Sequence, residues 1–339
     1  MRRRYLEKVV DVLRSTGFTE PVETIYIGGG TPNMLTWQEM EFLFKNIAEN
    51  VPRTSDCEIS CELNPELLTL NKLDLLNDHT TRLSLGVQSF DLAVRQALMR
   101  KCSQNKLLEA LKLLEKRQTE HFNIDLIYGI AGVDWQVFYR DIEQALQAGV
   151  DHLSCYALTP EENSLLGLQA PAADDGNAAD WWLKIGETLA AQGLPRYEVS
   201  NYARPGCGCR HNINVWRGGT LLGVGAAASG FDGVDRYTYE YDAASFVQGI
   251  PPEYDRISTV ARMLELWAVN LRTTAGWQRC DWEKIYPGSW DKMYKASCLA
   301  AGNDPDWWQV EDDNIALTQE GLLFWDDAAM QVLGWEENW

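Results

Sequence analysis

The sequence predicts an α/β fold in which a parallel sheet of βαβ units is followed by a small, mostly helical, winged-helix-like domain. Up to residue 200, short β-prone segments alternate with amphipathic helical patterns about every 30 residues, which is the rhythm of βαβ units. From residue 253 onward this alternation stops. Hydrophobic residues make up 45% of the 339 residues, enough for a packed core.

The βα part begins with a helix and continues with six predicted strands. The strands are expected at Glu23–Ile27, Cys57–Leu63, Arg82–Val87, Asn123–Tyr128, His152–Ala157 and Arg196–Ser200. The helices are expected at Tyr5–Ser15, Trp37–Glu49, Asn71–Asn77, Leu92–Met99, Gln104–Arg117, Trp135–Ala148 and Ala178–Gln192. Thr36 is the expected N-cap of the second helix.

The C-terminal part is rich in tryptophan, with nine of the fourteen tryptophans after residue 260. We expect them to pack in the core rather than to form a ligand cage. The helices are expected at Ile257–Leu271, Trp282–Ala300 and Glu320–Val332, and a hairpin at Trp307–Val310 with Ile315–Leu317. The predicted division is therefore 1–200 for the βα domain, 201–252 for a connecting segment and 253–339 for the C-terminal domain.

Charge and cysteine content limit the class of partner. The formal net charge is -19, with 49 acidic against 30 basic residues, which disfavours nucleic acid and anionic membrane surfaces. No run of eighteen apolar residues occurs, so no membrane span is expected. The eight cysteines are scattered through the chain, as is typical of reduced thiols. These features predict a cytoplasmic protein.

Polar groups follow the predicted strands at the edge where parallel strands end together. The first strand runs into Gly28, Gly29 and Gly30, a turn that exposes backbone groups to a ligand. Glu62, Gln88 and Asp125 stand at or near the ends of the following strands. Taken singly, the glycine turn could be a structural connection and each polar group could make a structural hydrogen bond. Together they predict a shared pocket.

A series of motifs carries a family resemblance over nearly the whole chain. The first set is Gly28-Gly29-Gly30-Thr31-Pro32, Glu62-Leu63-Asn64-Pro65, Leu83 to Phe90, Arg100 and Asn123 to Gly129; the second is Arg196 to Gly206, Cys209-Arg210-His211-Asn212, Trp216 to Gly219 and Gly223 to Ala226. Together they resemble the radical S-adenosylmethionine (SAM) group that contains oxygen-independent coproporphyrinogen III oxidase and the heme chaperones. The second set is more typical of the chaperone branch.

The resemblance implies a fold and a cofactor pocket. The fold would be a partial (β/α)6 radical-SAM-type barrel that lacks its first strand. SAM would be bound by Gly28, Gly29, Gly30, Thr31, Glu62, Gln88, Arg100 and Asp125. A carboxylate attracts the ammonium group of this cofactor or binds its ribose hydroxyls, and an arginine pairs with its carboxylate. Arg100 has an alternative interpretation as a solvated charge at a helix end.

The resemblance also implies a [4Fe–4S] cluster held by a CxxxCxxC loop. Cys57 and Cys61 have the first spacing, but residue 64 is asparagine, and alternation along a strand would point both the same way. Cys207 and Cys209 supply only two sulfurs. The loop would lie upstream of the helix at residues 5 to 15. We therefore expect either that the start codon is wrongly assigned and the cluster loop is encoded before Met1, or that the gene is truncated.

His211 and Cys209 are the candidate heme ligands, because imidazole and thiolate both serve as axial ligands of heme iron. In the chaperone branch the motif is His-Asn-x-x-Tyr-Trp, and here Val215 replaces the tyrosine. Family members often carry a histidine near the position of Ser229 as well. The alternative is that His211 is a structural histidine within a loop.

Three functional hypotheses remain, and catalytic residues stay unassigned. The first, which we favour, is a radical SAM heme chaperone that binds heme or a porphyrin and passes it to an acceptor protein. The second is a non-catalytic heme-binding protein without a cluster. The third is an oxygen-independent coproporphyrinogen III oxidase of porphyrin biosynthesis. Whether the chain is an enzyme depends on the cluster.

Overall fold

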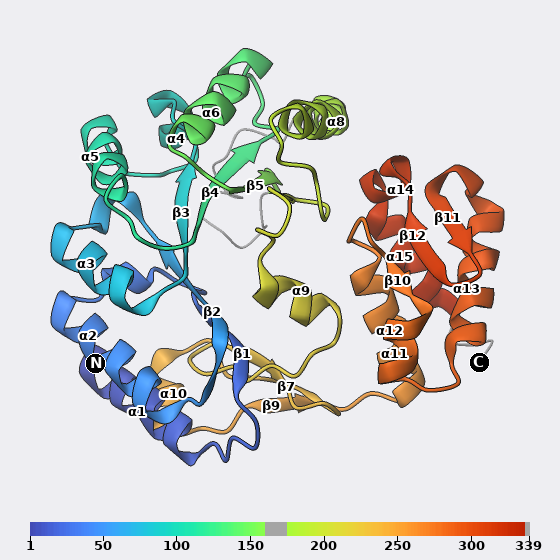
Figure 1. The fold of residues 1–339 in the computed structure, drawn as a ribbon, viewed down its shortest axis with the longest axis horizontal. Helices are drawn as coiled ribbons and strands as arrows, with labels where there is room; N and C mark the ends of the chain where they lie inside the picture. The colour runs from blue at the N-terminus through green and yellow to red at the C-terminus, as the bar shows by residue number, and fades with distance from the viewer. Residues whose placement is uncertain (160–174, 336–339) are drawn as a thin grey trace.

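A curved six-stranded sheet, in the order β1-β2-β3-β4-β5-β6, dominates the N-terminal part of the protein (Figure 1). The computed structural model describes residues 1–159 and 175–335. The strands are β1 (Val22–Ile27), β2 (Arg53–Leu63), β3 (Arg82–Gln88), β4 (His121–Tyr128), β5 (His152–Ala157) and β6 (Asn201–Ala203). The first five run parallel, so their carboxyl ends meet at one edge. The predicted α/β half-barrel is confirmed.

Helices cover the convex side of this sheet (Figure 1). They are α1 (Arg2–Ser15), α2 (Trp37–Asn50), α3 (Leu70–His79), α4 (Leu92–Ala97), α5 (Gln104–Leu114), α6 (Trp135–Gln147) and α8 (Asp175–Ala191). The predicted N-cap of α2, Thr36, is confirmed and forms a capping box. The Thr36 hydroxyl accepts a hydrogen bond from the Glu39 backbone N–H, and the Glu39 carboxylate accepts one from the Thr36 backbone N–H.

Alternation along the strands gives the sheet two different faces. Side chains such as Cys61, Leu83 and Ile124 are fully buried in the apolar core beneath the helices. The alternate positions, which face the inside of the curve, are polar: Thr24 and Tyr26 on β1, Glu58, Ser60 and Glu62 on β2, Arg82 and Ser84 on β3, Asn123 and Asp125 on β4, and His152 and Ser154 on β5. The concave face is therefore a polar lining.

The sixth predicted strand is wrong in position and direction. Residues 196–200 make only isolated antiparallel bridges, Arg196 with Tyr202 and Glu198 with Thr273, before a turn leads into β6 at Asn201–Ala203, which is antiparallel to β5. The Glu198 carboxylate, which is fully buried, accepts hydrogen bonds from the Ser200 N–H at 2.8 Å and the Asn201 amide at 2.6 Å. These bonds reverse the chain, so a β-prone composition in this segment does not produce a parallel strand.

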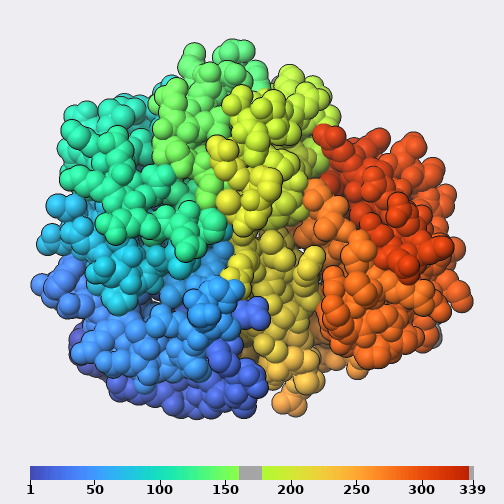
Figure 2. All heavy atoms as spheres, in the orientation of Figure 1, coloured from blue at the N-terminus to red at the C-terminus, as the bar shows by residue number. Residues whose placement is uncertain are grey.

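A second, antiparallel sheet fills the connecting region and was not predicted. Its strands are β7 (Ser229–Phe231), β8 (Arg236–Thr238) and β9 (Glu253–Asp255), with α9 (Arg210–Trp216) before them and α10 (Ala243–Gln248) between β8 and β9. Each strand has only three residues, too few to show a period-two pattern. Figure 2 shows part of this region, in yellow, between the barrel and the C-terminal domain.

The C-terminal domain combines helices with a small sheet. Its helices are α11 (Thr259–Asn270), α12 (Arg279–Ile285), α13 (Trp290–Asn303), α14 (Gln319–Leu323) and α15 (Trp325–Leu333), and its strands are β10 (Trp277–Gln278), β11 (Trp308–Glu311) and β12 (Asn314–Leu317). The predicted hairpin is confirmed. The expected helix Trp282–Ala300 is split at Pro287 and Gly288, which has a φ of 77°. The expected helix Glu320–Val332 is split at Phe324.

The C-terminal tryptophans that the structure describes pack in or against the core, as expected. Trp267, Trp277, Trp282 and Trp290 are fully buried, and the rings of Trp267 and Trp282 meet edge to face with centroids 4.8 Å apart. The indole N–H groups of these four tryptophans are satisfied, for example from Trp282 to the Ser289 hydroxyl at 2.8 Å. Among the described residues, no helix is both long and apolar enough to cross a membrane.

Candidate functional site

The glycine turn and Glu62 form one unit at the carboxyl end of the barrel. The Tyr26 hydroxyl donates to the Glu62 carboxylate at 2.8 Å, and the nearby Gly29 N–H acts to lower the pKa of the same carboxylate. A Cβ at Gly28 would lie 2.5 Å from the Tyr26 ring and 2.6 Å from a Glu62 carboxylate oxygen, so only glycine lets this carboxylate close over the turn. A Cβ at Gly29 or Gly30 would meet nothing within 4 Å, so the turn borders open space.

Asp125 lies beside this unit on the same polar lining. Its carboxylate accepts from the Asn123 amide at 2.8 Å and from the Ser84 hydroxyl at 3.1 Å. Desolvation by burial raises the pKa of Asp125, although these hydrogen bonds oppose the rise. Burial also raises the pKa of Glu62, and the nearby Asp125 charge adds to that rise. Among the described residues, neither carboxylate has an ion pair with a lysine or arginine.

The remaining predicted SAM residues differ in how the structure places them. Gln88 ends β3 in a left-handed conformation, with a φ of 71°, and its side chain folds back toward Gly86, the register partner of Asp125. Thr31 follows the glycine turn and precedes the short 3-10 helix Pro32–Met34. Arg100 is exposed in the turn after α4, and in the described part of the chain its side chain makes no hydrogen bond or ion pair. The structure thus joins Glu62, Asp125 and the turn, but not Arg100.

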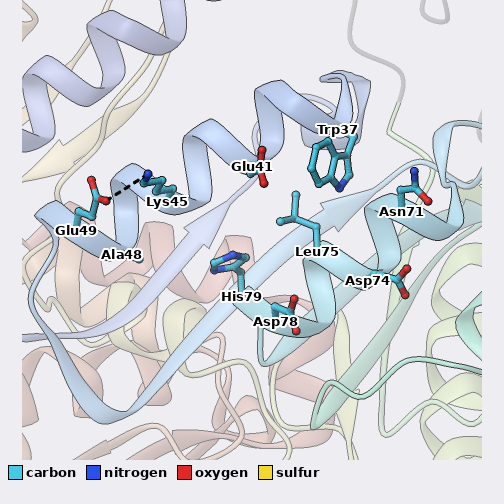
Figure 3. A pocket seen from close by; sticks show the side chains of 10 residues that line it. All are labelled: Trp37, Glu41, Lys45, Ala48, Glu49, Asn71, Asp74, Leu75, Asp78 and His79. Carbon is cyan, nitrogen blue, oxygen red and sulfur yellow. Dashed lines mark ion pairs between the residues drawn. The ribbon is translucent and has the colours of Figure 1, made fainter.

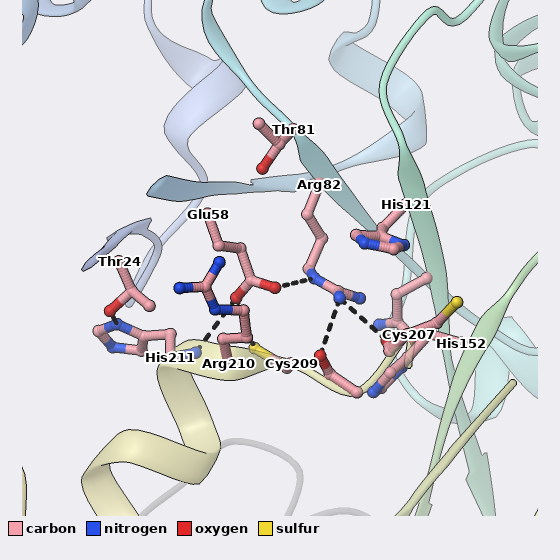
Figure 4. A network of polar contacts seen from close by, with 12 residues as sticks. Thr24, Glu58, Thr81, Arg82, His121, His152, Cys207, Cys209, Arg210 and His211 are labelled. Carbon is pink, nitrogen blue, oxygen red and sulfur yellow. Dashed lines mark hydrogen bonds and ion pairs between the residues drawn. The ribbon is translucent and has the colours of Figure 1, made fainter. Parts of the chain in front are cut away.

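A second polar layer lies at the amino end of the same lining (Figure 4). Glu58 and Arg82 form a buried ion pair with an N–O distance of 3.0 Å and relative exposures of 4% and 2%. Arg82 also donates to the carbonyls of Cys207 at 2.9 Å and Gly208 at 3.1 Å. The Glu58 carboxylate accepts from the His211 N–H at 3.1 Å. This ion pair therefore anchors the Cys-Arg-His-Asn segment to the barrel.

His152 completes the amino-end layer as a neutral, fully bonded histidine. Its Nδ1 lies 2.7 Å from the Asn123 amide oxygen, and its Nε2 lies 2.8 Å from the Tyr197 hydroxyl. Because the amide oxygen can only accept, Nδ1 carries the proton and the Tyr197 hydroxyl donates to Nε2. Burial, with a smaller contribution from the Arg82 charge, lowers the pKa of His152 to about 3. Asn123 contacts both Asp125 and His152, so it connects the two layers.

Sequence reasoning missed Tyr26, Ser84, Asn123 and the Glu58–Arg82 pair. The available signal was strand alternation, because residues an even number of positions apart on one strand share a face. Each missed residue either stands at such a spacing from Glu62 or Asp125, or pairs across the sheet with a residue that does. A polar residue at such a position inside a β-prone run indicates an inward-facing group.

Comparison with known proteins identifies the family. The radical SAM superfamily model matches residues 1–145. The heme chaperone HemW of Lactococcus lactis is 31% identical over 301 residues, which cover 86% of this chain and 79% of that protein. The chain belongs to the HemW family. The Escherichia coli HemW is 36% identical over 211 residues, which are 62% of this chain but only 56% of that relative, so this match spans little more than half of it.

The fold of this HemW family member agrees with a solved radical SAM structure. Coproporphyrinogen III oxidase (HemN) from Escherichia coli superposes with a TM-score of 0.81, covering 97% of this chain and 81% of that chain. The two sequences are 19% identical, so the likeness establishes the fold alone. It confirms the predicted half-barrel with a helical C-terminal region.

The HemW family implies SAM and a [4Fe–4S] cluster, and the residues fit the first of these only. The open glycine turn beside two carboxylates without cationic partners suits the amino group and ribose of SAM. In the described part of the chain, no three cysteines converge. The one group of side chains with metal-ligand spacing has a single cysteine, Cys207. Cys57 and Cys61 both lie on the convex, buried side of β2, as alternation predicted.

The two candidate heme ligands differ in availability. The His211 ring stacks on Tyr26 with centroids 5.0 Å apart, and its Nδ1 lies 3.1 Å from the Thr24 hydroxyl. Burial lowers the pKa of His211, so its imidazole is neutral at pH 7. Cys209 is 4% exposed, its sulfur donates to Glu58 at 3.6 Å, and burial raises its pKa to about 11. A buried, protonated thiol is a poor iron ligand, so the geometry favours His211 over Cys209.

A groove on the outside of the barrel lies away from both layers (Figure 3). It runs between α2 and α3, with Trp37 at one end and the carboxylates Glu41, Glu49, Asp74 and Asp78 along its sides. The strands' carboxyl ends do not contribute to it. We therefore place the candidate site on the concave face and not in this groove.

Proposed function

We propose that this protein is a heme chaperone that binds SAM at the carboxyl-end layer, binds heme through His211 and delivers it to an acceptor protein in the cytoplasm. The observation that carries the proposal is the contact between the His211 ring and Tyr26, whose hydroxyl holds the Glu62 carboxylate. A candidate heme ligand therefore stands one side chain away from the candidate SAM pocket. Family membership supports the same function, since the matched relatives are named heme chaperones.

The carboxyl-end residues have defined roles in this proposal. Glu62 and Asp125 attract the ammonium group of SAM and accept hydrogen bonds from its hydroxyls, while the backbone of Gly29 and Gly30 allows close approach. Thr31, Gln88 and Arg100 complete the pocket as further proposals. In this superfamily a [4Fe–4S] cluster would supply the electron for reductive cleavage of bound SAM. The described cysteines do not hold such a cluster, so we derive no radical step.

The heme-binding role of His211 rests on the way its ring is held. Thr24 fixes Nδ1 and Tyr26 supports one face of the ring, which leaves Nε2 without a hydrogen-bond partner among the described residues. A neutral imidazole with one oriented, unpartnered nitrogen is suited to ligate heme iron.

The division of the chain into domains at residues 200 and 252 remains a proposal as well.

A heme titration followed by visible absorption tests the assignment of His211. We expect His211→Ala to shift the Soret band and to weaken binding about tenfold or more, because an axial ligand is lost. His79→Ala is the matched control, since His79 stacks on Phe44 on the outer side of the barrel. Identical spectra and affinities for His211→Ala and the unmodified protein would overturn the assignment.

A heme-binding protein without a cluster is the second candidate. The observation in its favour is that no three cysteines converge in the described residues. The DNA upstream of the Met1 codon separates the two functions, because an in-frame CxxxCxxC loop there supports the first, and heme binding without such a loop supports the second. The likeness to the oxidase establishes a shared fold and does not favour a third candidate.

A further inference from the structure

Three side chains with metal-binding atoms converge at the amino end of the barrel, beside the layer that contains Glu58 and Arg82. His121 begins β4, Asp151 precedes β5 and Cys207 lies in the loop after β6. Their ligand atoms all lie within 4.8 Å of one another, and all three residues are partly exposed. Figure 4 shows His121 and Cys207 close to Arg82. We propose that His121, Asp151 and Cys207 form a zinc site that clamps the Cys-Arg-His-Asn segment to the barrel.

The donor set selects the metal. One imidazole nitrogen, one carboxylate oxygen and one thiolate sulfur suit a borderline-soft, tetrahedral cation such as Zn²⁺. Mg²⁺ and Ca²⁺ prefer oxygen ligands throughout and would leave the sulfur unused. Three protein ligands leave a fourth position for water, which the partial exposure of the side chains allows.

The backbone holds the three ligands before any metal binds. One Asp151 oxygen accepts from the Phe122 N–H at 2.9 Å, which turns the other oxygen toward His121. Arg204 ties the remaining ligand in place, because its N–H donates to the Asp151 carbonyl at 2.9 Å and its carbonyl accepts from the Cys207 N–H at 2.9 Å. Second contacts of this kind orient ligands in metal sites.

Metal binding requires only a small local change. His121 Nδ1 and the Asp151 oxygen are 2.6 Å apart, a hydrogen-bond distance. Two such ligands of one tetrahedral zinc ion lie about 3.3 Å apart, so this pair would separate by less than about 1 Å, and the Cys207 sulfur, within 4.8 Å of both, would complete the site by a side-chain movement. The charges also balance, since Zn²⁺ offsets the Asp151 carboxylate and the Cys207 thiolate while Glu58 offsets Arg82.

The site is independent of the proposed heme and SAM functions, because it shares no residue with either. Cys207 lies two residues before Cys209 and four before His211. A metal at Cys207 would therefore fix the start of the segment that carries His211. We expect metal binding to increase the thermal stability of the protein.

Titration of the metal-free full chain with Co²⁺, a spectroscopic substitute for Zn²⁺, tests the proposal. We expect one equivalent to bind with a thiolate-to-cobalt charge-transfer band and tetrahedral d–d bands, which Zn²⁺ then abolishes. X-ray absorption of the zinc form should show one sulfur neighbour with nitrogen and oxygen neighbours. Cys207→Ser should remove the charge-transfer band, and His121→Ala and Asp151→Asn should each weaken affinity at least about tenfold.

Cys280→Ser is the matched control, since Cys280 is an exposed thiol in the C-terminal domain. This variant should keep the band and the affinity. Circular dichroism establishes that each variant is folded. Absence of a thiolate band in the folded, unmodified protein would overturn the proposal, as would a band that persists in Cys207→Ser.

Discussion

The two polar layers of the barrel interior use similar residues in opposite ways. At the carboxyl end, Glu62 and Asp125 are carboxylates without an ion-pair partner among the described residues, next to an open glycine turn. At the amino end, Glu58 is paired with Arg82 and covered by the Cys-Arg-His-Asn segment. The first layer retains unsatisfied charge that a ligand can complete, whereas the second is completed by the protein itself.

Contacts within the concave face couple the two layers to each other. Asn123 contacts Asp125 in one layer and His152 in the other, and His211 contacts Glu58 through its backbone and Tyr26 through its ring. The amino-end layer therefore sets the position of the residues that would meet ligands at the carboxyl end.

The largest expected effect is on stability, from removal of the buried cation. Arg82→Met leaves Glu58 buried without its partner, so we expect a loss of about 3–5 kcal/mol in the free energy of unfolding, measured by urea denaturation. Lys106→Met is the control, because the Lys106–Glu109 ion pair, with an N–O distance of 2.7 Å, lies on the surface and its loss should change stability far less. Equal, small losses in both variants would remove the contrast between a closed layer and the surface.

The next effect is on the pH dependence of stability, with opposite signs in the two layers. His152 has a pKa of about 3 in the folded protein. A histidine in the unfolded chain takes up its proton near pH 6.5, so stability falls as the pH drops through this window. From pH 7 to pH 5 this loss amounts to about 2 kcal/mol. His152→Gln should flatten the loss.

Asp125 works in the other direction. Its pKa is higher in the folded protein than in the unfolded chain, so the folded state holds the proton more tightly. Lowering the pH towards the unfolded pKa therefore favours folding. Asp125→Asn should therefore steepen the loss of stability between pH 7 and pH 4 and stabilise the protein at pH 7. Urea denaturation of both variants across this range measures the two slopes. Slopes that change in the same direction would contradict the assigned charge states.

Local patterns predicted most elements, and distant contacts account for what they missed. The Thr36 cap, the five parallel strands and the C-terminal hairpin follow from residues close in sequence. The turn at residues 196–200 depends on the Glu198 side chain, which also pairs with Arg272 at 2.7 Å. No local pattern reports such a contact, so the β-prone composition of this segment predicts a strand that the structure does not contain.

The candidate site shows the same limit. Glu62, Asp125 and the glycine turn are predictable as one site because each lies at or near the end of a predicted strand, and parallel strands bring such ends together. The burial of Cys209 against Glu58 joins residues 151 positions apart, and composition alone does not indicate it. Arg100 was predicted from the resemblance, and its exposed side chain leaves that role as a prediction.

Calorimetric titration of SAM tests most directly whether the carboxyl-end layer is the binding site. The account predicts measurable affinity for the unmodified chain and a loss of about tenfold or more in both Gly28→Ala, which forces Glu62 out of place, and Asp125→Asn. His79→Ala, on the outer side of the barrel, should bind as the unmodified chain does. Unchanged affinity in Gly28→Ala and Asp125→Asn, or an equal loss in His79→Ala, would contradict it.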